Sequence, residues 1–500
     1  YAITNGSLAS TNNYALTINT TGANETVTAA NLTVNASNAT KTYGTSDPTL
    51  GYTTAGLVNG TVQSRDASGN LVNVTLADTA ANTLTGSLGR QSGEGVGNYA
   101  LTNGSLALAS GNASSNYQLT INTTGANETI TQASLTATAQ NASKTYGTDD
   151  PTLGYTTAGL VNGTVQSRDA SGNLVNVTLA DTAANTLTGS LGRQSGENVG
   201  NYAITNGSLA STNNYALTIN TTGANETITA ANLTVTAQNV TKTYGADDPT
   251  LAYTTSGLVS TTVQSRDASG NLVNVTLADT AANTLTGSLG RQSGEGVGNY
   301  AITNGNLAAD SNYRMTINLA NANETISAAG LTVTVTAQNV TKTYGTDDPT
   351  LAYTTAGLVN GTVKSRDASG NLVNVTISDS SSGTLTGGLG RQSGEGVGNY
   401  AITAGNLALS NGSANYAFVV NVTDANLTIT AANLTVNASS ATKIYGTYDP
   451  TLGYTTAGLV NGTVRSRDAS GALVNVTLND TAANTLTGSL GRQSGEGVGN

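Results

Sequence analysis

The chain has 500 residues and contains no Cys, no His and no Trp; only 9% of its residues are charged, and the net charge is −11. Without Cys and His it lacks disulfides, thiolate zinc ligands and the commonest general base, and without clustered Lys and Arg it lacks a nucleic-acid footprint. No run of about 18 apolar residues occurs, so no membrane span is expected. The composition therefore favours a non-catalytic protein without cofactors.

One unit of about a hundred residues recurs along the chain, which is the pattern of a tandem array. Each copy carries the motif Lys-x-Tyr-Gly, with its tyrosine at Tyr43, Tyr146, Tyr244, Tyr344 and Tyr445. The chain ends at Asn500 and begins at Tyr1-Ala-Ile-Thr, as Asn299 continues into Tyr300-Ala-Ile-Thr. We therefore expect it to be a segment of a longer protein.

The repeat predicts six segments. They are the C-terminal part of a repeat at 1–30, four repeats at 31–133, 134–231, 232–329 and 330–432, and the N-terminal part of a repeat at 433–500. The boundaries contain no Pro and almost no Gly, unlike flexible linkers. A strand is expected to leave one repeat and continue into the next after two or three residues, which predicts a stiff array.

In the third unit, alternating apolar and polar residues predict short strands. The expected strands are Leu233–Gln238, Leu251–Thr255, Thr262–Ser265, Leu272–Leu277, Thr284–Leu289, Asn299–Thr303, Tyr313–Asn318 and Glu324–Ser327. Turn residues separate them, and Leu277–Asn283 is expected to form one helical turn at most. We predict an all-β array of immunoglobulin-like β-sandwich domains placed end to end. A β-grasp-like α+β unit is the alternative.

Six short motifs follow one another along the unit, with substitutions in several copies: Lys-Thr-Tyr-Gly-x-x-Asp-Pro, Gly-Leu-Val-Asn-Gly, Thr-Leu-Thr-Gly-x-Leu-x-Arg, Gly-Glu-x-Val-Gly-x-Tyr-Ala-Ile, Asn-Tyr-x-Leu and Leu-Thr-Ile-Thr. In this order they resemble the MBG repeats of the Tyr-Gly type, found in large bacterial surface and secreted adhesins, including filamentous-haemagglutinin-like proteins. The resemblance implies extracellular or cell-surface stalk domains of all-β type and supplies no catalytic residues. The segment Gln264–Asn283 is an addition to the family pattern.

Two functions are compatible with near-identical repeats. The first is a non-catalytic stalk or filament for surface projection, cell adhesion and biofilm formation, with neighbouring copies of the array as partners, through main-chain pairing at strand edges or through Gln264–Asn283. The second is a set of modules that bind surface glycans or glycoproteins and multiply a weak affinity.

Asn-x-Ser/Thr sequons are dense, and one of them lies in Val-Asn-Val-Thr in all five units. There, Val273, Val275 and Leu277 are expected to point inward, while Leu272, Asn274 and Thr276 point outward. Either N-glycosylation or a polar solvent-facing strand explains the pattern. The candidate sites are Asn73, Asn176, Asn274, Asn374 and Asn475.

The lysine before each Tyr-Gly is the second recurring feature (Lys41, Lys144, Lys242, Lys342 and Lys443). A glutamate follows the tyrosine by 51 positions in every unit (Glu94, Glu197, Glu295, Glu395 and Glu496). We expect a surface ion pair or a solvated lysine. A Lys–Asn isopeptide crosslink assisted by a carboxyl group is the alternative, and it requires a buried apolar site.

The acidic pairs and the tyrosines of Gly-Asn-Tyr-Ala are two further recurring features. Acidic pairs before the proline of three units offer oxygen ligands for Ca²⁺, although a rigid turn explains them more simply. The pairs are Asp149/Asp150, Asp247/Asp248 and Asp347/Asp348. The tyrosines of Gly-Asn-Tyr-Ala are expected in the core with bonded hydroxyls; they are Tyr99, Tyr202, Tyr300 and Tyr400.

Overall fold

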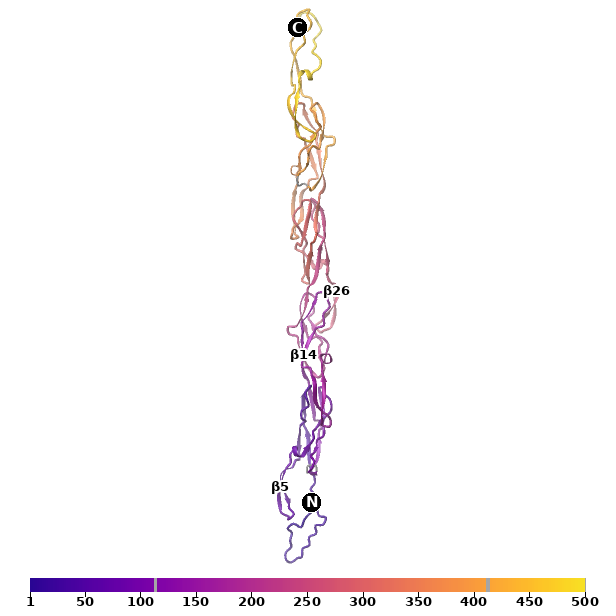
Figure 1. Cartoon of the computed structure of the whole chain (residues 1–500), viewed down its shortest axis with the longest axis vertical. Coiled ribbons are helices and arrows are strands. Elements are labelled where there is room, and N and C mark those ends of the chain that lie inside the picture. Colours follow the sequence, from indigo (N-terminus) through magenta and orange to yellow (C-terminus); the bar gives the residue numbers. More distant parts are fainter. Residues whose placement is uncertain (112–114, 411–413, 500) are drawn as a thin grey trace. The chain divides into compact units, whose positions relative to one another are not determined.

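The computed structural model describes residues 1–111, 115–410 and 414–499. It divides into two compact units, Tyr1–Ala231 with Val259–Ala278, and Asn232–Leu258 with Asp279–Asn500. Strands make up most of the regular structure of each unit (Figure 1). The helices α1, α3, α4, α5 and α6 have four residues each. The all-β prediction with repeated units of about a hundred residues is confirmed.

In the described residues of the first repeat there are eleven strands and the helical turn α1. In chain order they are β1 (Ala30–Ala36), β2 (Ala39–Thr42), β3 (Tyr52–Ala55), β4 (Asn59–Arg65), β5 (Leu71–Ala77), α1 (Ala80–Thr83), β6 (Leu84–Thr85), β7 (Gly89–Arg90), β8 (Gly97–Thr102), β9 (Ala107–Leu108), β10 (Tyr117–Asn122) and β11 (Asn127–Thr131). Later repeats reproduce this order.

The second repeat runs through β12 (Ala133–Ala139), β13 (Ala142–Thr145), β14 (Tyr155–Ala158), β15 (Asn162–Arg168), β16 (Leu174–Ala180), α3 (Ala183–Thr186), β17 (Leu187–Thr188), β18 (Gly192–Arg193), β19 (Gly200–Thr205), β20 (Ala210–Ser211), β21 (Tyr215–Asn220) and β22 (Asn225–Thr229). The third runs through β23 (Ala231–Ala237), β24 (Val240–Thr243), β25 (Tyr253–Ser256), β26 (Ser260–Arg266), β27 (Leu272–Ala278), α4 (Ala281–Thr284), β28 (Leu285–Thr286), β29 (Gly290–Arg291), β30 (Gly298–Thr303), β31 (Ala308–Ala309), β32 (Tyr313–Asn318) and β33 (Asn323–Ser327).

The fourth repeat runs through β34 (Ala329–Ala337), β35 (Val340–Thr343), β36 (Tyr353–Ala356), β37 (Asn360–Arg366), β38 (Leu372–Ser378), α5 (Ser381–Thr384), β39 (Leu385–Thr386), β40 (Gly390–Arg391), β41 (Gly398–Thr403), β42 (Ala408–Leu409), β43 (Tyr416–Asn421) and β44 (Asn426–Thr430). The last segment has β45 (Thr435–Ala438), β46 (Tyr454–Ala457), β47 (Asn461–Arg467), β48 (Leu473–Asn479) and α6 (Ala482–Thr485).

Each repeat forms two mixed sheets and a hairpin. In the first repeat one sheet has the order β10-β1-β3, the other has the order β2-β11-β8-β7, and β4 and β5 form the hairpin. The pairs β1/β10 and β2/β11 are parallel, and the pairs β1/β3, β8/β11, β7/β8 and β4/β5 are antiparallel. Only two residues separate β1 from β2, so the chain passes directly from one sheet to the other.

The strands form because apolar residues recur at every second position. In β1, Leu32 and Val34 are fully buried, whereas Asn31 is exposed. Leu84, Leu88 and other apolar residues of the repeat pack against them in one core cluster. The turn α1 begins at Thr79, whose side chain accepts from Asn82 N while Asn82 Oδ1 accepts from Thr79 N. This capping box stabilises the single helical turn.

Most of the strands predicted in the third repeat are present, with shifted ends. The prediction missed β24, because a four-residue strand that contains a lysine has little apolar periodicity. It also missed the two-residue strands β29 and β31. The single helical turn lies at Ala281–Thr284, near the predicted segment. One residue, rather than two or three, separates β11 from β12 and β22 from β23. In the part of the chain that the structure describes, no helix is long and apolar enough to cross a membrane.

Candidate functional site

The hairpin of each repeat after the first, including that of the partial repeat at 433–500, lies against the preceding repeat. In the first compact unit, Asp47 N donates to Gln166 O of β15 at 2.8 Å, and Arg168 N donates to Asp47 Oδ2 at 2.6 Å. At the hairpin tip, Thr102 Oγ1 donates to Ala170 O at 2.6 Å. The main chain of the hairpin therefore bonds directly to the preceding repeat. We call this contact the joint.

The same joint occurs three more times, each within one compact unit. The amides of Asp150, Asp248 and Asp348 donate to the carbonyls of Gln264, Lys364 and Arg465, each at 2.8 Å. Docking buries one valine of each hairpin: Val165, Val263, Val363 and Val464 are 2–7% exposed, whereas Val62 in the first hairpin is 44% exposed. Of the repeat that precedes this first hairpin, the sequence contains only residues 1–30. The segment Gln264–Asn283 thus begins in a hairpin that docks on its own chain.

The Tyr-Gly motif forms the second half of the joint. Tyr43 donates its hydroxyl to Asp181 Oδ2 of the next repeat at 2.8 Å, and its ring meets Tyr215 edge to face at 5.5 Å. Burial, followed by the hydrogen bond to Asp181, raises the pKa of Tyr43 to about 12. Tyr244 and Tyr344 bond Asp379 and Asp480 in the same way, at 2.9 and 3.1 Å.

Gly44 lets the next repeat approach. Its φ is +86°, and a Cβ there would lie 2.5 Å from Val161 Cγ2. Any side chain would therefore strain the backbone and collide with the next repeat. The equivalent glycines face valines in the same way: Gly147 faces Val259, Gly245 faces Val359 and Gly345 faces Val460.

A buried cluster of ion pairs lies beneath each joint. In the first repeat, Lys41 Nζ is 2.6 Å from Asp47 Oδ1 and 2.5 Å from Glu94 Oε2. Arg90 pairs with Asp47 at 2.7 Å and Glu94 at 2.5 Å, and Glu128 Oε2 is 2.8 Å from Arg90 Nε. We call these five residues the ion-pair cluster. Its equivalents are Lys144, Asp150, Arg193, Glu197 and Glu226; Lys242, Asp248, Arg291, Glu295 and Glu324; and Lys342, Asp348, Arg391 and Glu395 with Leu427.

The docked hairpin closes the cluster. Arg90 Nη2 donates to Ser167 Oγ of the next repeat at 2.8 Å, as Arg193 does to Ser265. Burial alone would raise the pKa of Asp47, but hydrogen bonds from Arg90, Lys41 and the Arg168 amide outweigh it and hold the pKa below its ordinary value. Since one of those donors belongs to the next repeat, docking and charge pairing support each other.

One carboxyl group in the cluster is poorly compensated. Glu128 is fully buried, and neither of its oxygens has a hydrogen-bond partner. The nearby Arg90 guanidinium favours the ionised form, but burial and the charge of Asp47 outweigh it and raise the pKa of Glu128. Burial and Asp248 raise the pKa of the equivalent Glu324 to about 7. In the fourth repeat Leu427, also fully buried, holds this position, which shows that the site accepts a side chain without charge.

Comparison with known families identifies the repeat. The family model of the MBG domain (YGX type) matches residues 32–126, 135–224, 233–323 and 333–428. The chain belongs to this family. No curated protein and no solved structure matches the chain. The tyrosine and glycine of the YGX motif are the residues that contact the next MBG repeat at the joint.

The MBG joint corrects two predictions. The lysine before Tyr-Gly is ion-paired but is not on the surface in the first four copies, where its side chain is 2–3% exposed. Its partners are Asp and Glu carboxylates, so the geometry does not bring it to the asparagine that an isopeptide crosslink needs. The sequence contained a signal for the group but not for its burial: lysine, aspartate, arginine and glutamate recur at fixed spacings in every copy.

The acidic pairs hold the joint together. Asp149 Oδ1 accepts from the amide of Gln264 at 2.8 Å, while Asp150 pairs with Lys144 and Arg193. The pair Asp247/Asp248 makes the equivalent contacts, as does Asp347/Asp348. Within the described ranges, no group of three or more His, Cys, Asp or Glu could hold a metal ion.

The sequons of Val-Asn-Val-Thr lie on the second strand of each hairpin. All five asparagines are exposed, and Asn274 faces Gln264 across β26/β27. The expectation for Val273 was wrong: it is 41% exposed, beside Leu272 at 49%. Glycosylation of Asn73, Asn176, Asn274, Asn374 and Asn475 stays a prediction, which glycopeptide mass spectrometry of native material decides.

The tyrosines of Gly-Asn-Tyr-Ala lie at the edge of the core. Tyr99 is half-buried and donates its hydroxyl to Gly95 O at 2.8 Å. The guanidinium carbon of Arg90 lies 5.0 Å from the centre of its ring, a cation–π distance. Tyr202, Tyr300 and Tyr400 contact Arg193, Arg291 and Arg391 in the same way. The tyrosine thus covers the ion-pair cluster.

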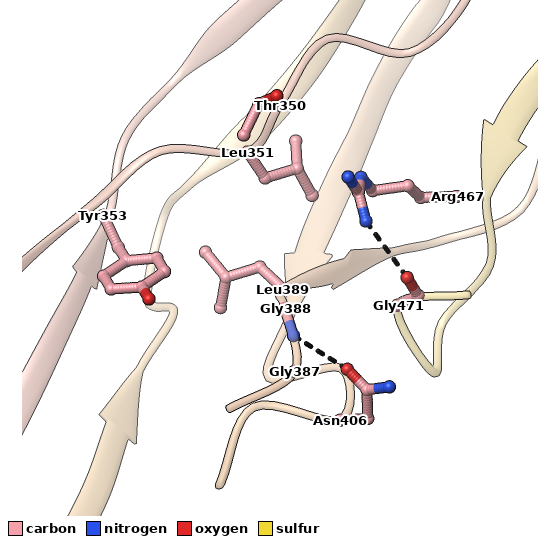
Figure 2. Close-up of a pocket in the computed structure, with 9 residues that line it drawn as sticks. All are labelled: Thr350, Leu351, Tyr353, Gly387, Gly388, Leu389, Asn406, Arg467 and Gly471. Atoms are coloured by element: carbon pink, nitrogen blue, oxygen red, sulfur yellow. Dashed lines mark hydrogen bonds between the residues drawn. The ribbon is translucent and has the colours of Figure 1, made fainter. Parts of the chain in front are cut away.

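A cavity opens at the joint between the fourth repeat and the following hairpin (Figure 2). Arg467 donates to Gly471 O at 3.1 Å there, and Gly388 N donates to Asn406 Oδ1 at 2.8 Å. In the third repeat the position of Gly388 is held by Ser288, whose hydroxyl donates to Gly370 O and accepts from Arg366. The cavity therefore lacks the serine hydroxyl that lies beside the equivalent arginine in the third repeat.

Proposed function

We propose that this chain is a non-catalytic region of a large extracellular adhesin, in which interlocked MBG repeats form a stiff stalk or filament. The stalk projects from the cell surface and supports attachment between cells or to a surface. Its repeats divide near residues 30, 133, 231, 329 and 432, and its partners include neighbouring copies of the array.

The joint carries this proposal. Each repeat receives a hairpin from its successor and presents Tyr-Gly to it, so the two are linked by more than the single residue that separates their strands. The charges of the ion-pair cluster bond to one another and to the docked hairpin. They are therefore committed to holding the repeat together and are not open to a substrate.

The glycan-binding alternative has weaker support. A multivalent binder needs the same pocket in each module. At the equivalent positions of the first three repeats, the hydroxyls of Ser87, Ser190 and Ser288 accept from the matching arginines, so the lining of the cavity at Arg467 is not the same in every module. Binding of the chain to an array of glycans would favour this alternative, whereas a spacer should bind none.

Small-angle scattering of the 500-residue chain tests the stalk proposal. We expect the profile of a rod with a step of about 35–45 Å for each repeat, from strands of about 3.3 Å per residue stacked end to end. A control carries a ten-residue Gly-Ser insertion after Thr131, which should introduce one flexible bend. A compact or randomly flexed particle for the unmodified chain would contradict the proposal.

A further inference from the structure

The two ends of each repeat lie on neighbouring parallel strands. In the first repeat, Ala30–Asn35 of β1 align with Tyr117–Asn122 of β10, and Ala39–Thr42 of β2 align with Glu128–Thr131 of β11. The first arm, β1 with β2, therefore lies beside the last arm, β10 with β11, over ten residue pairs. The same registers occur in the second repeat.

This arrangement decides how tension acts on a repeat. Tension along the chain pulls the start of β1 one way and the end of β11 the other. Because the two arms are parallel and side by side, these points lie at opposite ends of the paired region. The load is then directed along the strands, and their hydrogen bonds must break together. In an antiparallel pair pulled from its open end, the bonds would break one at a time.

The connections between repeats transmit this load. One residue, Gln132, separates the end of β11 from the start of β12. Ala230 and Ala328 hold the same place at the next two boundaries. A connection of one residue has almost no slack to extend before the next pair of arms is loaded. Most of each repeat, including its hairpin, lies between the two arms in the sequence. This part is protected from the load until the arms separate.

We propose that the paired parallel arms are a mechanical clamp, and that each MBG repeat is built to bear tension applied along the chain. The inference rests on the proposed stalk role, because only a tethered stalk is put under tension. It adds a second activity to that role, namely resistance to pulling by an attached cell or surface.

Pulling single molecules in two directions tests the clamp. The chain has no Cys, so handles can be attached at chosen places. In the variant Tyr1→Cys/Val498→Cys the load runs along the chain. We expect repeated rupture events, each releasing about 300–350 Å, since about a hundred residues extend at roughly 3.6 Å each, less the folded length.

The matched variant is Asn31→Cys/Gln118→Cys. These two exposed residues are direct partners across β1 and β10, so the same strands are pulled apart from one end. We expect the rupture force to fall at least two-fold relative to end-to-end pulling. Circular dichroism must first show that both variants are folded as the unmodified chain. Equal forces in both directions, or a lower force end to end, would overturn the clamp. A rod in scattering with low rupture forces would refute the clamp alone and leave the stalk.

Discussion

Replacing Arg291 by methionine is expected to lower the free energy of unfolding of the third repeat by about 3–5 kcal/mol, the usual cost of breaking a buried ion pair. Arg291 is fully buried and pairs with Asp248 and Glu295. Without its guanidinium, Lys242 alone would face these two carboxylates. Hydrogen exchange of the peptide that contains Tyr313–Asn318, which is unique in this chain, reports on the third repeat.

Arg492→Met is the matched control for this substitution. Arg492 makes the equivalent ion pairs with Asp449 and Glu496, but all three side chains are substantially exposed. Solvent screening makes such pairs weak, so the control should change exchange little. If Arg291→Met left the exchange of the third repeat as in the unmodified chain, the ion-pair cluster would not stabilise the fold.

Raising the pH from 5 to 8 is expected to destabilise the third repeat while leaving the fourth nearly unaffected. The pKa of Glu324 is raised to about 7 in the fold, chiefly by burial and then by the charge of Asp248. In the unfolded chain the pKa is near its ordinary value of about 4.5. The folded state therefore binds the proton more tightly, and stability falls as the pH rises from that value through about 7.

Protonation also balances the charges of the cluster. Lys242 and Arg291 are positive, Asp248 and Glu295 are negative, and an ionised Glu324 would add a buried negative charge. The pKa of Asp248 is lowered, because its hydrogen bonds outweigh its burial. The stability that the ionised Asp248 contributes is therefore lost only at acidic pH, as the pH falls through its folded pKa. The effects of Glu324 and Asp248 on stability thus occupy separate pH ranges.

Glu324→Leu is the decisive variant for the pH effect. It copies the fourth repeat, where Leu427 is fully buried beside Arg391. The variant should make the third repeat more stable at pH 8, on the order of a few kcal/mol, and remove the decline between pH 5 and 8. The peptide that contains Tyr416–Asn421 is the internal reference. A decline that persists in the variant would show that another group causes it.

The strands could be predicted because their signal is local. Leu272–Leu277 and Tyr313–Asn318 alternate apolar and polar residues, and the observed strands cover them. The parallel pairing of the arms could not be predicted, since strand order depends on contacts between residues far apart in the sequence. The strand β24 was missed because its lysine turns inward to a carboxylate, which apolar periodicity does not detect.

The cluster and the joint were hidden for a different reason. A lysine that recurs with an aspartate and a glutamate has the same pattern whether the group is solvated or buried. Burial depends on a hairpin contributed by the next repeat, through groups such as the Arg366 amide. A single repeat does not contain that information. The exposure of Val273 was mispredicted for the same reason: it is the cross-strand partner of the buried Ser265, yet it is 41% exposed.

Hydrogen exchange of one hairpin in a joint variant tests the central claim, that the Tyr-Gly motif seats the hairpin of the next repeat. In Gly245→Val the new side chain meets Val359, since even a Cβ would lie 2.9 Å from Val359 Cγ1. The peptide that contains Thr362–Arg366 is unique in this chain because of Lys364. Its amides should lose their protection from hydrogen exchange. The strand Ser260–Arg266, which docks on the second repeat, should keep its protection from exchange. Gly446→Val is the control, because Gly446 has the same φ of +84° but nothing within 4 Å. Full protection of Thr362–Arg366 in a folded Gly245→Val chain would contradict the account.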